Sequence, residues 1–116
     1  MANGRNNDLV VPGLRNVFSD LGLRDTEEKQ TRVRLAVAIN QIIQPLSQTA
    51  AARLLEVNQP KISALMHYRL DGFSVERLMH FLNALDRDVE IVIRKKPRSR
   101  RSARITVTEA QLPNAG

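Results

Sequence analysis

Two short helix patterns that follow each other within residues 48–67 constrain the fold of this chain more than any other feature. Ser47 is a natural N-cap for the first pattern, over 48–55. Pro60 is favoured in the first turn of the second pattern, and a very short turn separates the two. This spacing predicts two short helices with a tight connection, placed between longer helices on either side.

The small and apolar residues of this segment predict how the two helices pack. Ala52 allows the second helix to cross closely, Val57 fills the turn, and Ile62 and Leu65 fix the second helix to the core. Glu56 occupies a position in the turn between the two helices where glycine is usual. Glycine is preferred there because the position often takes a left-handed conformation, which costs other residues about 1 kcal/mol or more. The segment therefore predicts a helix-turn-helix unit.

Further helix patterns flank this unit. Asp25 and Glu28 have the spacing of a capping box, and apolar residues at three- and four-residue steps continue the first helix to just before Pro45. Ser74 caps a third short helix with its own apolar face. We therefore predict a mainly α fold, a compact helical bundle that contains the helix-turn-helix and is followed by a C-terminal β-strand or hairpin.

The hydrophobic period changes from 3.6 to 2 after residue 88. Val89, Ile91 and Ile93 then fall on one side of a predicted strand of about six residues. A lone strand needs a partner, which is either residues 104–108 in a hairpin or the same strand of a second subunit, in which case these three residues form the dimer contact. The predicted division of the chain is a flexible N-terminal arm that can contain one short helix (1–24), the helix-turn-helix domain (25–88), a strand, basic loop and optional second strand (89–108), and a disordered tail (109–116).

The composition excludes several classes of protein. The chain has no cysteine, two histidines, no paired carboxylates and no phosphate-binding glycine loop, so we expect no metal, no cofactor and no enzyme activity. No apolar run approaches the roughly 20 residues of a membrane span and the N-terminus is polar, so we expect a cytoplasmic protein without a membrane partner. One tyrosine and three phenylalanines are too few for single-strand stacking surfaces, which favours double-stranded DNA as the nucleic-acid ligand.

Positive charge is concentrated just after the predicted strand. The formal net charge is +6, yet outside residues 94–104 the chain has 11 basic and 12 acidic residues. The basic segment comprises Arg94, Lys95, Lys96, Arg98, Arg100, Arg101 and Arg104. It is predicted to attract phosphates, beside or around the duplex that the helix-turn-helix binds, or to bind an acidic partner protein. The alternative interpretation is a solubilising tail that never orders.

Three parts of the sequence resemble one known family: residues 48–67, Phe73-Ser74 and residues 89–93. They are similar to xenobiotic-response-element (XRE) type regulators related to phage Cro and repressor proteins, and more narrowly to the HigA-like branch, in which residues 18–22 also have counterparts. The resemblance covers about residues 17–94. With the helix-turn-helix it predicts a sequence-specific transcriptional regulator, a repressor, that acts at the nucleoid as a homodimer. Its recognition helices would enter the major groove of a palindromic operator about 34 Å apart.

The resemblance also implies an alternative function from another class. The same domain occurs in antitoxins of type II toxin–antitoxin pairs. Such a protein would neutralise a small RNA-cleaving toxin of the RelE or HigB type and would repress its own operon.

The geometry of a helix-turn-helix predicts which residues contact DNA. The second helix lies in the major groove with its N-terminal residues at the base edges. These residues are Asn58, Gln59, Lys61 and Ala64, with His67 one turn further and the cations Arg53 and Arg69 nearby. Gln59 can pair with adenine, Lys61 can donate to guanine, and Ala64 can contact a thymine methyl.

The resemblance adds Gln48, which it implies contacts phosphate and braces Gln59. Less specific interpretations stay open for several of these positions. Asn58 and Gln59 would then only cap their helix, and Lys61 would be a solvated surface lysine. His67 would lie near phosphate rather than at a base.

Overall fold

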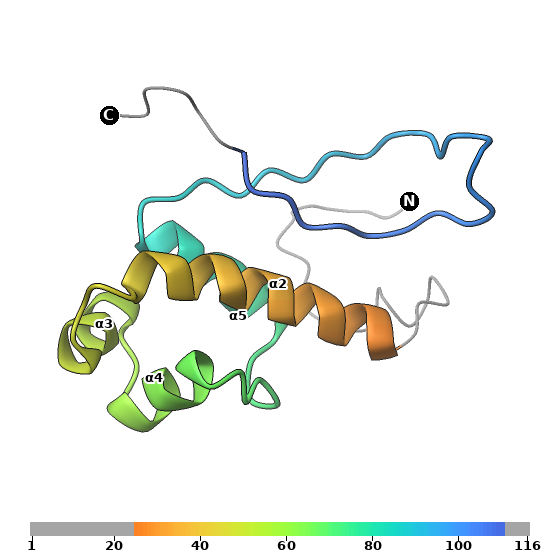
Figure 1. The fold of residues 1–116 in the computed structure, drawn as a ribbon. Helices are drawn as coiled ribbons and strands as arrows, with labels where there is room; N and C mark the ends of the chain where they lie inside the picture. The colour runs from red at the N-terminus through yellow and green to blue at the C-terminus, as the bar shows by residue number, and fades with distance from the viewer. Residues whose placement is uncertain (1–24, 111–116) are drawn as a thin grey trace, which may run out of the picture.

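The computed structural model describes residues 25–110, in which four helices form the body of the protein (Figure 1). They are α2 (Asp25–Ile43), α3 (Gln48–Leu55), α4 (Gln59–Met66) and α5 (Val75–Ala84). Helix α2 packs against α4 and α5, and α3 packs against the same two helices. The mainly helical fold is confirmed. The predicted N-terminal arm, 1–24, and residues 111–116 of the predicted tail lie outside the described residues.

The core lies between α2 and the three shorter helices. Its largest fully buried side chains come from α2, α4, α5 and the loop before α5, and they are Ile39, Ile43, Ile62, Leu65, Phe73 and Leu78. Burial of each such side chain stabilises the fold by about 1.5–3 kcal/mol. Asn40 of α2 donates from Nδ2 to the carbonyl oxygen of Leu65 at 3.0 Å, which fastens α2 to the end of α4. None of the helices in residues 25–110 is long and apolar enough to cross a membrane.

The three short helices begin in the same way. In each, the side-chain oxygen of the N-cap accepts a hydrogen bond from the backbone N–H three residues later, at 2.9–3.0 Å. The pairs are Ser47 with Ala50, Asn58 with Lys61, and Ser74 with Arg77. Each cap stabilises its helix by about 1 kcal/mol, and together the caps fix where the chain enters each helix.

The three short helices also end in the same way. Glu56, Tyr68 and Asp86 each take a left-handed conformation, with φ between 57° and 62°. After α3, the N–H of Glu56 bonds to the carbonyl of Arg53 at 3.3 Å and the N–H of Val57 bonds to that of Ala52 at 3.0 Å. The same pair of bonds closes α4 and α5, and it is the Schellman motif that usually carries glycine. The chain therefore makes its tight turns with residues that strain the backbone.

The predicted C-terminal strand and hairpin are not confirmed, because the described residues contain no strand. Residues 88–110, here called the C-terminal arm, leave the end of α5 in an extended conformation, turn and come back (Figure 1). Val89 and Val107 are half-buried and pack against the core, which anchors the base of the arm. Ile91 and Ile93 are 76% and 92% exposed. Alternating residues favour extended backbone, but a strand forms only when a partner supplies the hydrogen-bond ladder.

Candidate nucleic-acid interface

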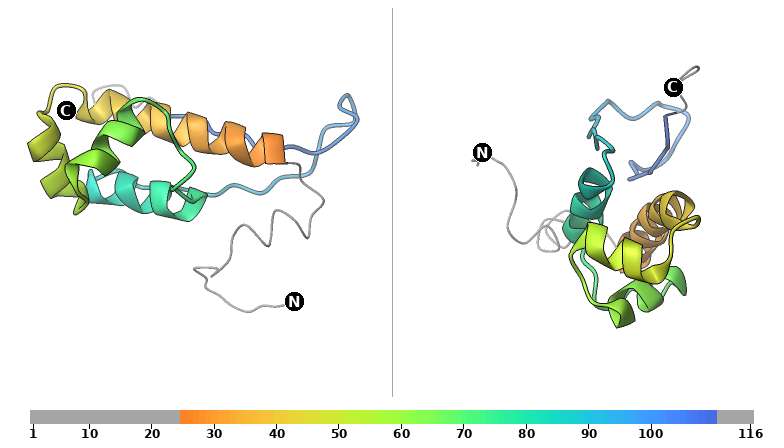
Figure 2. Two further views of the ribbon diagram at one scale, coloured as in Figure 1. Left: turned by 90° about the horizontal axis from the view of Figure 1, so that it is seen from below. Right: turned by 90° about the vertical axis from the view of Figure 1, so that its left-hand side faces the viewer.

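Helix α4 presents its first turn to solvent on the side of the molecule that faces away from α2. Ile62 and Leu65 are buried and hold α4 against the core, whereas Asn58 and Gln59 are exposed. Figure 2 shows α4 in front of α2 when the molecule is seen from below, with the arm behind. Sequence geometry and structure therefore agree on a free polar face at the start of α4.

The side chain of Gln59 is held by α3. Its Nε2 donates to Oγ1 of Thr49 at 3.0 Å. The resemblance implied that Gln48 would brace Gln59, but Nε2 of Gln48 instead lies 3.9 Å from Sδ of Met66 at the other end of α4. Thr49 is thus a site residue that the sequence analysis missed. The sequence feature that could have identified Thr49 is its position next to Gln48 at the start of α3.

Asn58 has the capping role that was left open as its alternative. Its Oδ1 accepts from the N–H of Lys61 at 2.9 Å, and its backbone is extended with φ −80°. This oxygen is therefore engaged in fixing the first turn of α4. A contact of Asn58 with a base would therefore use the other atoms of this exposed side chain and not Oδ1.

Lys61 does not extend into solvent as either interpretation of the sequence expected. Its Nζ lies 5.0 Å from the centre of the Phe73 ring, a cation–π contact, and the side chain is half-buried. Gly72 lies beside it, since a Cβ at this glycine would be 3.1 Å from the same Nζ. Lys61 is folded back on the loop before α5, so donation to a guanine requires it to leave Phe73.

The remaining predicted residues of the second helix differ in how they are placed. Ala64 is half-buried and packs against the core, which limits the methyl surface that it can offer to a thymine. His67 is exposed, and its Nδ1 is 2.8 Å from the carbonyl oxygen of Ser63. Because a carbonyl only accepts, Nδ1 donates there and Nε2 is the outer ring nitrogen. Arg53 and Arg69 are both exposed, as their predicted role requires.

The basic segment of the arm is ordered by two of its own cations. Nζ of Lys96 donates to the carbonyl oxygens of Pro97 and Arg100, at 3.2 and 2.6 Å, and Nη1 of Arg100 donates to that of Ser102 at 3.2 Å. The other five basic side chains are exposed, and they are Arg94, Lys95, Arg98, Arg101 and Arg104. The basic segment lies beyond α2 from α4 in both figures, not beside the start of α4.

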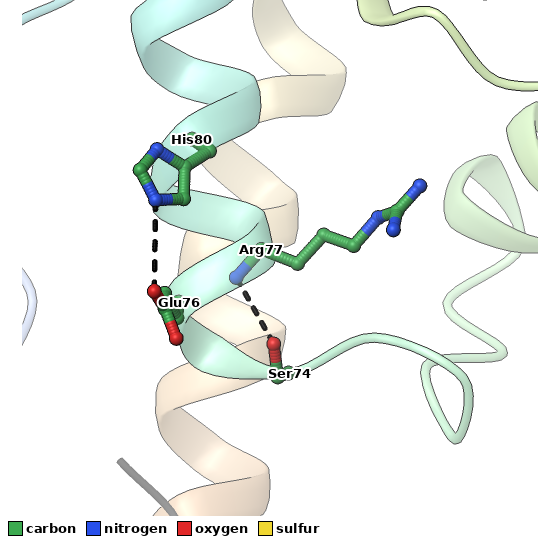
Figure 3. A network of polar contacts seen from close by, with 4 residues as sticks. All are labelled: Ser74, Glu76, Arg77 and His80. Atoms are coloured by element: carbon green, nitrogen blue, oxygen red, sulfur yellow. Dashed lines mark hydrogen bonds and ion pairs between the residues drawn. The ribbon is translucent and has the colours of Figure 1, made fainter. Parts of the chain in front are cut away.

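A shallow groove between the end of α3 and α5 carries a second set of polar side chains. Nε2 of His80 lies 3.7 Å from Oε2 of Glu76, and Arg77 points to the other side of α5 (Figure 3). The Arg77 guanidinium stands over the ring of Phe81, 5.3 Å from its centre. His80 is thus a surface residue that contacts Glu76, one helical turn away on the same face of α5.

A helix cap at Asn58, a glutamine fixed by the preceding helix and a tight left-handed turn at Glu56 define a helix-turn-helix protein. A family model described as a helix-turn-helix domain matches residues 17–94. The chain therefore belongs to this helix-turn-helix family.

Comparison with solved structures gives a relative at 65% sequence identity with a TM-score of 0.73. That protein is assigned to the XRE family of transcriptional regulators, and the match covers 75% of this chain and 100% of the other. Comparison with curated proteins gives no match.

Proposed function

We propose that this protein is a sequence-specific double-stranded DNA-binding transcriptional regulator, a repressor, that inserts α4 into the major groove. The observation that carries the proposal is the fixed position of Gln59, exposed at the start of α4 and hydrogen-bonded to Thr49 of α3. A glutamine amide can donate to and accept from one adenine, and a pre-oriented amide loses less rotamer entropy on binding. The family membership and the relative assigned to the XRE regulators support the same function.

The remaining DNA contacts are assigned by position. Exposed Gln48, at the start of α3, and the cations Arg53 and Arg69 contact the sugar-phosphate backbone. His67 lies near phosphate, and a contact through Nε2 requires the doubly protonated ring, because Nδ1 already donates within the protein and a phosphate oxygen only accepts. These contacts fix the register of α4 on the duplex, whereas Gln59 supplies base recognition.

The regulator acts as a homodimer, in the cytoplasm at the nucleoid. Support comes from Ile91 and Ile93, which are largely exposed on an extended segment with strand-like alternation. Exposed apolar residues on unpaired extended backbone are a template for pairing with another chain. The same segment of a second copy would cover them and would supply the missing ladder.

The decisive experiment begins by selecting bound sequences from random duplex DNA. The Gln59→Ala variant is then compared with the wild type on the selected duplex and on a scrambled duplex, by gel shift at one salt concentration. We expect the preference for the selected duplex to fall roughly 5- to 150-fold, which corresponds to the loss of one bidentate base contact. Gln41→Ala, an exposed glutamine of α2, is the matched control. An unchanged preference in the Gln59 variant would refute the assignment.

The alternative, a toxin-neutralising function, depends on a protein partner. Co-purification of a small protein with this chain from its native cells would establish that partner. A toxin reading frame adjacent to the gene would point the same way.

A further inference from the structure

We propose that the basic tip of the arm, residues 94–104, is a second DNA-binding site that holds a duplex other than the one bound by α4, so that the protein bridges two DNA segments. The inference rests on the proposed function, because it takes α4 as the site for the first duplex. It goes beyond that function in giving the arm a separate ligand.

The C-terminal arm and the free face of α4 lie on opposite sides of α2. Ile62 and Leu65 face the core, so the free face of α4 is directed away from α2, and the arm lies beyond α2 in each view (Figures 1 and 2). The molecule measures 44 × 34 × 26 Å, and duplex DNA is stiff over about 150 base pairs. A duplex seated on α4 would have to bend around the whole protein to meet the tip of the arm.

Dimer formation does not remove this separation. A two-fold axis that directs two copies of α4 at one duplex passes through that duplex. Rotation about this axis does not change how far along the axis an atom lies. The C-terminal arms of both copies therefore stay on the side of the dimer that faces away from the DNA. The start of α4 and the tip of the arm are therefore on opposite sides in the monomer and in the proposed dimer.

The chemistry of the tip fits a phosphate backbone better than a protein surface. No acidic residue lies between Glu90 and Glu109, and five of the seven cations in 94–104 are exposed. The other residues of 94–104 are proline, serine and alanine, so the tip itself has no large apolar side chain to anchor a protein partner, although exposed Ile93 and Ile105 lie just outside it. Duplex DNA offers regularly spaced phosphates, to which arginine donates in pairs.

The tip is also prepared to present its charges. Lys96 and Arg100 satisfy carbonyl groups of the turn, and the N–H of Arg100 bonds to the carbonyl of Pro97 at 3.2 Å. Arg98 and Arg101, which flank Arg100 in this turn, are exposed. Two basic residues thus shape the turn, and their exposed neighbours are available to phosphate.

The test uses the full chain and two duplexes of equal length. A duplex selected by the protein is fixed on beads and loaded with protein, and a fluorescent duplex of unrelated sequence is then added at low salt. The variants are Arg98→Gln/Arg101→Gln in the tip and Lys29→Gln/Arg34→Gln on the exposed surface of α2, which removes the same charge. Retained fluorescence measures bridging, and retained protein measures binding to the first duplex.

We expect the wild type and the α2 variant to retain the second duplex. We expect the tip variant to retain about tenfold less, with a salt slope for the second duplex lower by about 1.8, because two phosphate contacts are lost. Its affinity for the bead duplex should stay within about twofold of the wild type.

Two outcomes would overturn the proposal. If the tip variant binds the bead duplex more weakly and with a flatter salt dependence, the arm contacts the same duplex as α4. If the wild type holds the bead duplex but never retains the second one, the tip is not a DNA site, and an acidic protein surface becomes its ligand class. In both cases the proposed function survives, because it fails only if Gln59→Ala leaves the choice of the bead duplex unchanged.

Discussion

Thr49 of α3 accepts a hydrogen bond from the side-chain amide of Gln59 in α4, with Nε2 and Oγ1 3.0 Å apart. This bond links the two helices of the helix-turn-helix on their exposed side. The same two helices also pack together on the buried side, where Ala52, Ile62 and Leu65 belong to one hydrophobic core. The core thus fixes the angle of α4, and Thr49 fixes the one side chain to which we assign base recognition.

The Thr49→Val variant tests this link, because valine keeps the shape of threonine and removes the hydroxyl. We expect affinity for the selected duplex to fall about 2- to 10-fold, the equivalent of one neutral hydrogen bond, with little change in thermal stability since the site is exposed. Gel shift measures the affinity. Thr26→Val, at an exposed position of α2, is the control. Equal affinities for the two variants would show that Gln59 does not need its partner.

The Lys61–Phe73 contact predicts a stability effect at a residue in the candidate interface. Lys61→Met keeps much of the aliphatic chain and removes the ammonium group above the ring. We expect the free energy of unfolding to fall by about 0.5–2 kcal/mol, because the lysine is half-buried and the ring is buried, between the exposed and the desolvated cases of a cation–π pair. Urea denaturation of this variant and of Lys29→Met, an exposed lysine of α2, makes the comparison. A loss of DNA affinity with no loss of stability would mean that Lys61 acts only on DNA.

The left-handed turn at Glu56 predicts a stabilising substitution. Glycine adopts φ 57° without the strain imposed by a side chain, so Glu56→Gly should raise the free energy of unfolding by about 0.5–1 kcal/mol. For a domain of this size that corresponds to a rise in Tm of roughly 2–8 °C. Gln41→Gly, inside α2, should instead destabilise by about 1 kcal/mol. Calorimetry that finds both variants less stable would contradict the strain at Glu56.

The exposed isoleucines of the arm predict the oligomeric state. Ile91→Lys/Ile93→Lys should convert a dimer into a monomer, because it places charges where a second strand would pack. Sedimentation velocity gives the mass, and circular dichroism shows that the helices remain. Val33→Lys/Val37→Lys is the control, at exposed apolar residues of α2. A monomeric control with a dimeric arm variant would place the interface on α2.

The helical part of this fold could be predicted because its signals are local. Ser47 and Ser74 cap their helices through residues three positions away, and Pro60 lies in the first turn of α4, so a short window of sequence contains all the partners. The left-handed conformation at Glu56 could be anticipated for the same reason. Helix periodicity then identifies the side that is buried.

The parts that could not be predicted depend on residues distant in sequence. Lys61 contacts Phe73 across a loop, and Gln59 reaches a hydroxyl ten positions earlier, so neither side-chain direction follows from helical spacing. The predicted strand at 89–93 has the right alternation, yet alternation does not supply a hydrogen-bonding partner. The position of the arm beyond α2 is likewise a property of the packed protein.

The length of α4 limits how much sequence information one copy can read. Eight residues make a helix about 12 Å long, which spans only three to four base pairs at about 3.4 Å each. Four base pairs occur by chance about once in every 256 positions, whereas a genome offers about 10⁶ or more competing sites. In the proposed dimer two copies would read about eight base pairs, which still recur about once in every 65,000 positions. The spacing and shape of the DNA between the half-sites would then have to supply the remaining discrimination.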